Sequence, residues 1–125
     1  MARTPVTGID LTAVSWKTVE EVYGDVGFQT VPGELVCILS EDAQTGGGTV
    51  LVKLPAGWGS DAPERHSCLQ EEVLLEGDLT IAGVELVAPS YLCFPPGFAH
   101  GPVSTREGCI VLASHDGPVD VEYLR

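Results

Sequence analysis

Basic residues are scarce in this chain of 125 residues, which has 6 Lys and Arg against 18 Asp and Glu and a formal net charge of −12. Nucleic acids and anionic membrane surfaces both attract clustered Lys and Arg, so neither is an expected partner. No apolar run approaches the roughly 20 residues of a membrane-spanning helix, and the first residues show no signal peptide. We therefore expect a cytoplasmic protein whose partner is a small molecule, a metal cation or another protein.

Cysteine pairs of the CxxC type are also absent. The four cysteines are Cys37, Cys68, Cys93 and Cys109, and without a secretory signal they are expected to be free thiols in a reducing compartment. All but Cys68 lie in apolar stretches and are expected in the core. The chain also lacks the glycine-rich loop of nucleotide-binding proteins and the G-x-S-x-G turn of serine hydrolases, so neither chemistry is supported.

Short segments rich in Val, Leu and Ile make up most of the chain, and 15 Gly and 9 Pro residues are spread among them. Short strands at regular spacing, with such turn residues between them, are typical of an all-β sandwich or barrel. Tight turns are expected at residues 46–48 and 76–78, and one short helix over residues 15–23, ended by Gly24. The predicted strands cover residues 34–39, 49–54, 71–75, 79–81, 91–94, 109–114 and 119–124.

Two of the three histidines have informative surroundings. His66 opens a polar segment that runs into an apolar one, and His100 follows a Pro-Pro-Gly turn further along the chain. If the first segment is a strand, alternate side chains share a face. That face carries His66, Cys68, Gln70, Glu72 and Leu74. Imidazole and carboxylate suit zinc, iron, manganese or nickel, and a thiolate favours zinc or iron. The two segments can face each other across a barrel, which favours a metal site.

The segments HSCLQEEVLLEGDL and FPPGFAHGP resemble the two metal-binding motifs of the cupins, and the single-domain ChrR-like cupins are most similar in layout. The first motif is H-x-H-x(3)-E before an apolar strand that ends in Gly, and the second is P-x-G-x-x-H. The resemblance implies an all-β fold, a small antiparallel β-barrel or double-stranded β-helix of the jelly-roll type with at most one short helix. It divides the chain into an N-terminal arm, residues 1–33, with the helix and an edge strand, and a cupin barrel, residues 34–125.

The same resemblance implies a set of metal ligands. His66 matches the first histidine of the first motif, Glu72 its glutamate, and His100 the histidine of the second motif. Cys68 stands where the family has its second histidine. The predicted ligands of one divalent metal ion, zinc or iron before manganese or nickel, are therefore His66, Cys68, Glu72 and His100.

The glutamate position has two candidates. Counted from His66 it is Glu72, the predicted catalytic residue, which would bind the ion or act as a general base. Counted back from Gly77 it is Gln70, and both side chains share one strand face.

Several neighbouring side chains are interpreted as structural. Arg65 and Glu71 have the opposite parity from the predicted ligands and are expected to face solvent. His115 lies at the end of a strand before a turn and is expected at the surface. Trp58 is expected in the core or at its rim.

Cupins host many chemistries, so three classes of function stay open. The first is metal-dependent chemistry on a small organic molecule, of the dioxygenase, lyase, isomerase or cyclase type. The second is a non-catalytic module that binds or senses a metal or ligand, and the third is a cupin that has lost its metal and binds only a ligand. Cupins often pair their barrels through edge strands, so a homodimer is one arrangement that the resemblance implies.

Overall fold

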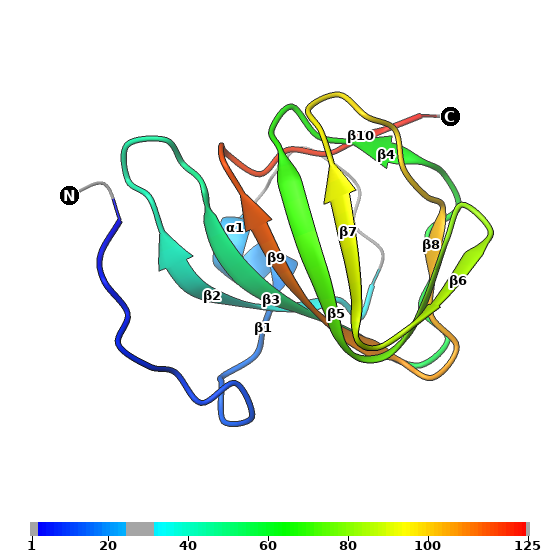
Figure 1. Cartoon of the computed structure of the whole chain (residues 1–125), viewed down its shortest axis with the longest axis horizontal. Helices are drawn as coiled ribbons and strands as arrows, with labels where there is room; N and C mark the ends of the chain where they lie inside the picture. The colour runs from blue at the N-terminus through cyan, green and yellow to red at the C-terminus, as the bar shows by residue number, and fades with distance from the viewer. Residues whose placement is uncertain (1–2, 25–31, 125) are drawn as a thin grey trace.

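The computed structural model describes residues 3–24 and 32–124, and antiparallel strands form nearly all of the regular structure there (Figure 1). One helix, α1, occurs among the described residues, which confirms the expected all-β class with a short helix. No helix in these ranges is long and apolar enough to cross a membrane. The elements in chain order are β1 (Lys17–Thr18), α1 (Val19–Tyr23), β2 (Leu35–Glu41), β3 (Gly48–Leu54), β4 (Glu64–Arg65), β5 (Gln70–Ile81), β6 (Val84–Val87), β7 (Ser90–Phe94), β8 (Val103–Ser104), β9 (Cys109–His115) and β10 (Glu122–Tyr123).

Strand β5 connects the two parts of the main sheet. The strands of this sheet run in the order β1-β2-β3-β9-β5-β6, with β7 and β8 also paired to β5. The first half of β5 lies between β7 and β9, and its last residues pair with β6 and β8. A second, two-stranded sheet joins β4 to β10. In Figure 1 the long strands β3, β9 and β5 lie side by side, and β4, β6 and β8 lie beyond β5. The sheet thus curves around an interior.

The turn predicted at residues 76–78 is wrong, because β5 continues through this segment as one strand. The pairing of β5 with β9 shifts register between Leu74 and Glu76 instead. Gly77 has a φ of 82°, and a Cβ atom there would overlap the carbonyl oxygen of Gly108. A bulge of this kind bends a strand and increases its twist. The strands predicted at residues 71–75 and 79–81 are therefore the two halves of β5.

Most other predicted strands are confirmed, with differences at their ends. Residues 34–39, 49–54, 91–94 and 109–114 correspond to β2, β3, β7 and β9. The turn predicted at residues 46–48 is confirmed too, since it leads from β2 into β3. Only Glu122–Tyr123 of the strand predicted at 119–124 is formed, as β10. The short strands β4, β6 and β8 were not predicted, because two to four residues carry too little periodicity.

The helix is shorter than predicted, because its first turn begins at Val19 and not at residue 15. The Thr18 hydroxyl caps it by accepting a hydrogen bond from the Glu21 N–H, and Gly24 ends it at a φ of 67°. Thr18 also belongs to β1, which pairs with β2 at the edge of the sheet. The division into an arm (residues 1–33) and a barrel stays a prediction, and residues 25–31 lie outside the described part of the chain.

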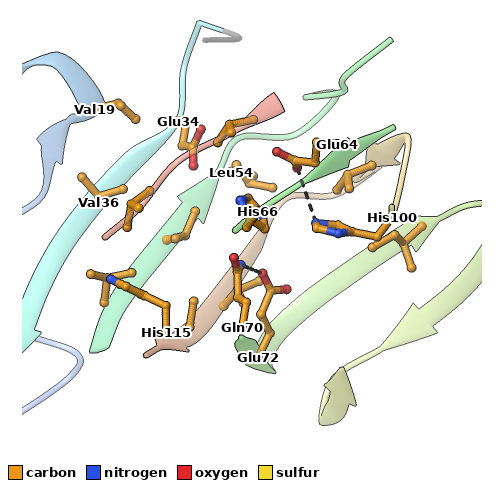
Figure 2. Close-up of a pocket in the computed structure, with 18 of the residues that line it drawn as sticks. Val19, Glu34, Val36, Leu54, Glu64, His66, Gln70, Glu72, His100 and His115 are labelled. Carbon is orange, nitrogen blue, oxygen red and sulfur yellow. Dashed lines mark hydrogen bonds and ion pairs between the residues drawn. The ribbon is translucent and has the colours of Figure 1, made fainter. Parts of the chain in front are cut away.

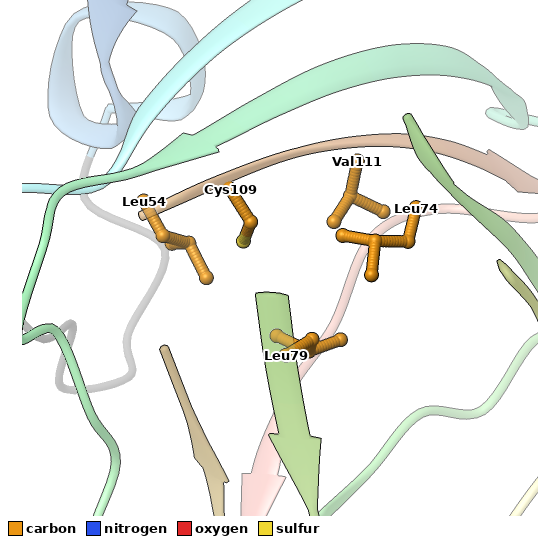
Figure 3. Packing of buried hydrophobic residues seen from close by; sticks show 5 residues of the cluster. All are labelled: Leu54, Leu74, Leu79, Cys109 and Val111. Carbon is orange, nitrogen blue, oxygen red and sulfur yellow. The ribbon is translucent and has the colours of Figure 1, made fainter. Parts of the chain in front are cut away.

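The buried core lies where β3, β9 and β5 face one another. Figure 3 shows its main cluster, in which side chains from these three strands point toward a common centre. The cluster consists of Leu54, Leu74, Leu79, Cys109 and Val111. Leu74 is 0% exposed, so it anchors the centre of β5.

All four cysteines are free thiols, but only some are in the core. Cys109 is buried as predicted, and Cys37 is partly buried. The prediction for Cys93 is wrong, because alternate residues of β7 face solvent and Cys93 is one of these.

Candidate metal centre

A cavity of about 160 Å³ lies inside the barrel. Its walls are largely aliphatic, because β2, β3, β5 and β9 each turn small branched side chains inward, as at Val36, Val50, Ile81 and Val111. Polar side chains gather on the remaining surface. They are Glu34, Glu64, His66, Gln70, Glu72, His100 and His115. The arrangement of a few convergent polar groups in an apolar cavity is typical of a ligand-binding site.

Three of these polar residues can share one metal ion. Glu64, His66 and His100 each bring a ligand atom to within 4.8 Å of the others. Figure 2 shows them on one side of the cavity, with the Glu64 carboxylate directed at the His100 ring. His66 and His100 are 9% and 6% exposed, so a bound ion would be largely shielded from water.

Backbone hydrogen bonds hold the two histidine segments together. The N–H of Glu64 donates to the carbonyl of His100 at 2.7 Å, and the N–H of His100 donates back to the carbonyl of Glu64 at 2.8 Å. The N–H of Gly97, in the Pro-Pro-Gly turn, donates to the carbonyl of His66 at 2.8 Å. The turn before His100 therefore docks onto β4 and the residue that follows it.

Contacts to the back of each ring orient the two imidazoles. Nδ1 of His66 is bonded to the carbonyl oxygen of Asp120, and Nδ1 of His100 lies 3.4 Å from the carbonyl oxygen of Phe98. A carbonyl oxygen can only accept, so Nδ1 donates in each ring and Nε2 is the nitrogen that would face a metal ion. Phe94 also stacks on His100, with ring centroids 3.9 Å apart. Such outer contacts are usual for metal-binding histidines.

The donor set fits a divalent transition metal. Two imidazoles and one carboxylate leave open positions for a substrate, and this combination suits iron, zinc, manganese or nickel. The sequence-based prediction of a site that joins His66 and His100 agrees with this geometry, because their ring nitrogens are close enough to bind the same ion. The metal's identity stays a prediction.

The carboxylate beside the two histidines is Glu64, which sequence analysis missed. Glu64 stands two residues before His66, so strand alternation would place both side chains on one face. The sequence analysis applied this rule only to the residues after His66. Glu72 lies on β5 in the wall of the same cavity, where its Oε1 atom accepts a hydrogen bond from Nε2 of Gln70 at 2.5 Å. Both candidates for the family's glutamate position therefore face the cavity, and the choice between them stays open.

Cys68 is the predicted ligand that the structure does not bring to the histidines. Residues 66–69 leave the strand conformation before β5 begins at Gln70, so alternation does not extend from His66 to Cys68. Cys68 is 7% exposed, faces Gly117, and is not among the residues that line the cavity. Burial and the charges of Asp120 and Asp116 raise the pKa of its thiol, which disfavours the thiolate that a metal requires.

Replacing Cys68 with serine is expected to leave metal affinity within about twofold of wild type. Nothing in the described geometry places its sulfur near the imidazoles, and serine is similar in size. Isothermal titration of both proteins with Zn²⁺ measures this. A loss of about tenfold or more would show that the thiolate is a ligand after all, as the cupin resemblance implies.

The remaining sequence-based interpretations have mixed outcomes. Arg65 faces outward and forms an ion pair with Glu122 at 2.8 Å, and Glu71 is exposed, both as expected. His115 was expected at the surface but is partly buried and lines the cavity beside Gln70, its register partner in the pairing of β5 with β9. The end of a strand can still face the interior of a curved sheet, which the local sequence around His115 does not reveal.

The acids of the cavity hold their protons more tightly than usual. Burial raises the pKa of Glu72 to about 7, and the charge of Glu64 adds to this while Gln70 opposes it. Burial likewise raises the pKa of Glu34 to about 7, together with the charges of Glu64 and Glu72. Burial raises the pKa of Glu64 too, and it lowers that of His100 to about 4. A bound cation would relieve the crowding of these carboxylates.

These shifts make the stability of the metal-free chain depend on pH. Since the folded chain keeps the Glu72 proton up to a pKa of about 7 and the unfolded chain releases it near 4.5, this residue stabilises the fold at low pH. Its contribution is lost as pH rises through this range. The free energy of unfolding of Glu72→Gln should therefore fall less steeply between those pH values than that of wild type. Urea titrations with chelator test this, and parallel curves would contradict it.

Comparisons with known proteins show the fold. No family model and no curated protein matches this chain. Among solved structures, an acetylacetone dioxygenase from Acinetobacter johnsonii matches with a TM-score of 0.68 and 20% identity, over 98% of this chain and 82% of the other. An RmlC-like cupin from Shewanella frigidimarina matches with a TM-score of 0.64 and 16% identity, over 95% and 96% of the two chains. The chain therefore has the cupin fold, as the resemblance implied.

ChrR is also among the similar structures. The anti-sigma protein ChrR of Rhodobacter sphaeroides, solved in complex with SigE, matches with a TM-score of 0.62 and 23% identity. The match covers 86% of this chain but 52% of ChrR, so this chain spans about half of that protein. The sequence motifs suggested a layout similar to that of ChrR, and the structures of the two proteins share this fold.

Proposed function

We propose that this chain binds one divalent metal ion through Glu64, His66 and His100 and uses it to transform a small organic molecule. The observation that carries the proposal is the position of the three ligand atoms on the wall of a mainly aliphatic cavity. A bound divalent ion would polarise an oxygen atom of the substrate and orient it. The cavity wall would supply the rest of the chemistry.

Glu72 is the candidate general base. It lies in the same cavity as the proposed ligands but outside their group, and burial raises its pKa to about 7. A carboxylate with a pKa near the working pH is suited to accept and return a proton. The Gln70 amide donates to the carboxylate of Glu72 and so fixes its orientation toward the cavity.

The aliphatic walls would hold the body of the substrate and exclude water. The fold's likeness to an acetylacetone dioxygenase favours dioxygenase chemistry on a carbonyl compound among the open classes. A small dicarbonyl compound also has oxygen atoms that suit a polarising metal ion. Lyase, isomerase and cyclase chemistry would use the same Lewis acid and base.

The test loads the chain separately with Fe²⁺, Zn²⁺, Mn²⁺ and Ni²⁺ and supplies acetylacetone and related dicarbonyl compounds in air. Oxygen consumption and proton NMR measure turnover. The proposal expects turnover with at least one ion, and its loss in Glu72→Gln while the metal stays bound. Metal binding without turnover of any compound would instead support the second candidate.

The second candidate is a non-catalytic module that binds a metal or a ligand. It is supported by the likeness to ChrR, which was solved in complex with SigE. The same three ligands would then hold an ion as a structural or sensing element. It differs from the first candidate in expecting that the Glu72→Gln variant binds the metal or ligand as the wild type does and that neither protein shows turnover.

A further inference from the structure

Among the residues that the structure describes, the cavity walls carry acidic groups and no Lys or Arg. Three carboxylates line it, from Glu34, Glu64 and Glu72. Two of them are already engaged, because Glu64 lies with the proposed metal ligands and Glu72 accepts from Gln70. Glu34 precedes β2, is partly buried, and points into the cavity from the side nearest Glu64 (Figure 2).

The basic residues of the described chain lie elsewhere. Arg65 is paired with Glu122 on the outer surface, and the Arg106 side chain is exposed near Glu85. The others are Arg3, next to Thr49, and two exposed lysines, Lys17 and Lys53. Arg125 alone lies outside the described residues. Among the described residues, a carboxylate ligand would therefore find no Lys or Arg in the cavity. The basic side chains there are histidines, and burial lowers the pKa of His100 and of His115.

The charge of a bound divalent ion does not change this conclusion. A bound divalent cation favours the ionised form of the three neighbouring carboxyl groups, although burial raises their pKa values in its absence. Once ionised, they more than balance the charge of the ion, so an anionic ligand would add a further negative charge beside them. Like charges brought together in a buried site cost several kcal/mol, which is a means of rejecting wrong ligands.

We propose that this cavity selects small uncharged organic molecules over carboxylates, and that Glu34 is a specificity-determining residue for this choice. The inference rests on the proposed function only in that the same cavity binds the organic molecule. A molecule with a hydroxyl or amide N–H can donate to the Glu34 carboxylate. A volume of about 160 Å³ suits a ligand of about the size of benzene, which fills cavities of about 150 Å³.

Pyruvamide and pyruvate form a matched pair of probes. They have the same number of non-hydrogen atoms and the same adjacent carbonyl groups, but only pyruvate is charged. Isothermal titration of the Zn²⁺-loaded chain should show pyruvamide binding at least about tenfold more tightly than pyruvate. In Glu34→Gln, which removes one charge and keeps the shape, this ratio should fall by about tenfold.

Glu71→Gln is the control, because it makes the same change in charge on the solvent-facing side of β5. Its ratio should equal that of wild type. The inference is overturned if pyruvate binds wild type as tightly as pyruvamide, if Glu34→Gln leaves the ratio unchanged, or if neither probe binds at millimolar concentration.

A separate Zn²⁺ titration of each variant distinguishes a failure of metal binding from a failure of ligand selectivity. If no ion binds, the proposed metal chemistry fails, and the same pair is then titrated into the metal-free chain. The carboxylates of the cavity should still favour pyruvamide there, and equal binding overturns the inference.

Discussion

Replacement of His100 with alanine is expected to lower the affinity for a divalent ion by about 100-fold or more. Alanine removes the Nε2 atom that lies with the ligand atoms of Glu64 and His66 and leaves two of three protein ligands. The backbone hydrogen bonds between residues 64 and 100 do not involve the side chain, so the turn should stay docked. Isothermal titration with Zn²⁺ measures the change.

His115→Gln is the matched control for this experiment. His115 lines the same cavity but does not belong to the group of three ligands. Its replacement should change metal affinity by no more than about twofold, and circular dichroism should show that both variants fold. Wild-type affinity in His100→Ala, or an equal loss in His115→Gln, would contradict the proposed ligand set.

The second large effect concerns the bulge in β5. Gly77→Ala is expected to destabilise the fold by roughly 2–4 kcal/mol, because it adds strain at a positive φ and a steric overlap. The φ of Gly77 is 82°, and the added Cβ would meet the carbonyl of Gly108 in the neighbouring segment. The carbonyl of Gly108 belongs to the backbone, and the new Cβ is fixed to the backbone of β5. Neither atom can move aside without disturbing the pairing of β5 and β9. Urea unfolding measures the difference.

Gly83→Ala separates the two causes. Gly83 has a φ of 81°, almost the same as Gly77, but no atom lies within 4 Å of the Cβ position. It should therefore cost only the backbone penalty of an L-residue at positive φ, roughly 1–2 kcal/mol. Equal losses in the two variants would show that the close approach to Gly108 does not matter.

The fold and two of the three proposed ligands, His66 and His100, could be predicted from the sequence. Alternating short apolar segments are a local signal, so β2, β3, β7 and β9 were predicted close to their observed ends. The bulge at Gly77 was interpreted as a turn, because a Gly next to an Asp is common both in bulges and in turns. What distinguishes them is the approach of Gly108, a contact between residues far apart in the chain.

The site shows the same boundary between local and long-range information. His66 and His100 were assigned to one metal site because their segments resemble two known motifs. The alternation of side chains along a strand could have placed Glu64 in the same site. The position of Cys68 depends on the end of the strand conformation at Arg65, which parity alone does not show. Glu34 and His115 enter the cavity through the curvature of the whole sheet. No pattern in their own neighbourhoods predicts this.

The central claim is that Glu64, His66 and His100 together hold one metal ion. The most direct measurement is elemental analysis of the chain, first as purified without added metal and then after loading with Zn²⁺ or Fe²⁺ and removal of the excess. The result expected is one ion per chain in wild type and none in a variant that combines Glu64→Gln with His66→Ala. A wild-type chain that retains no ion under any loading condition would contradict the account.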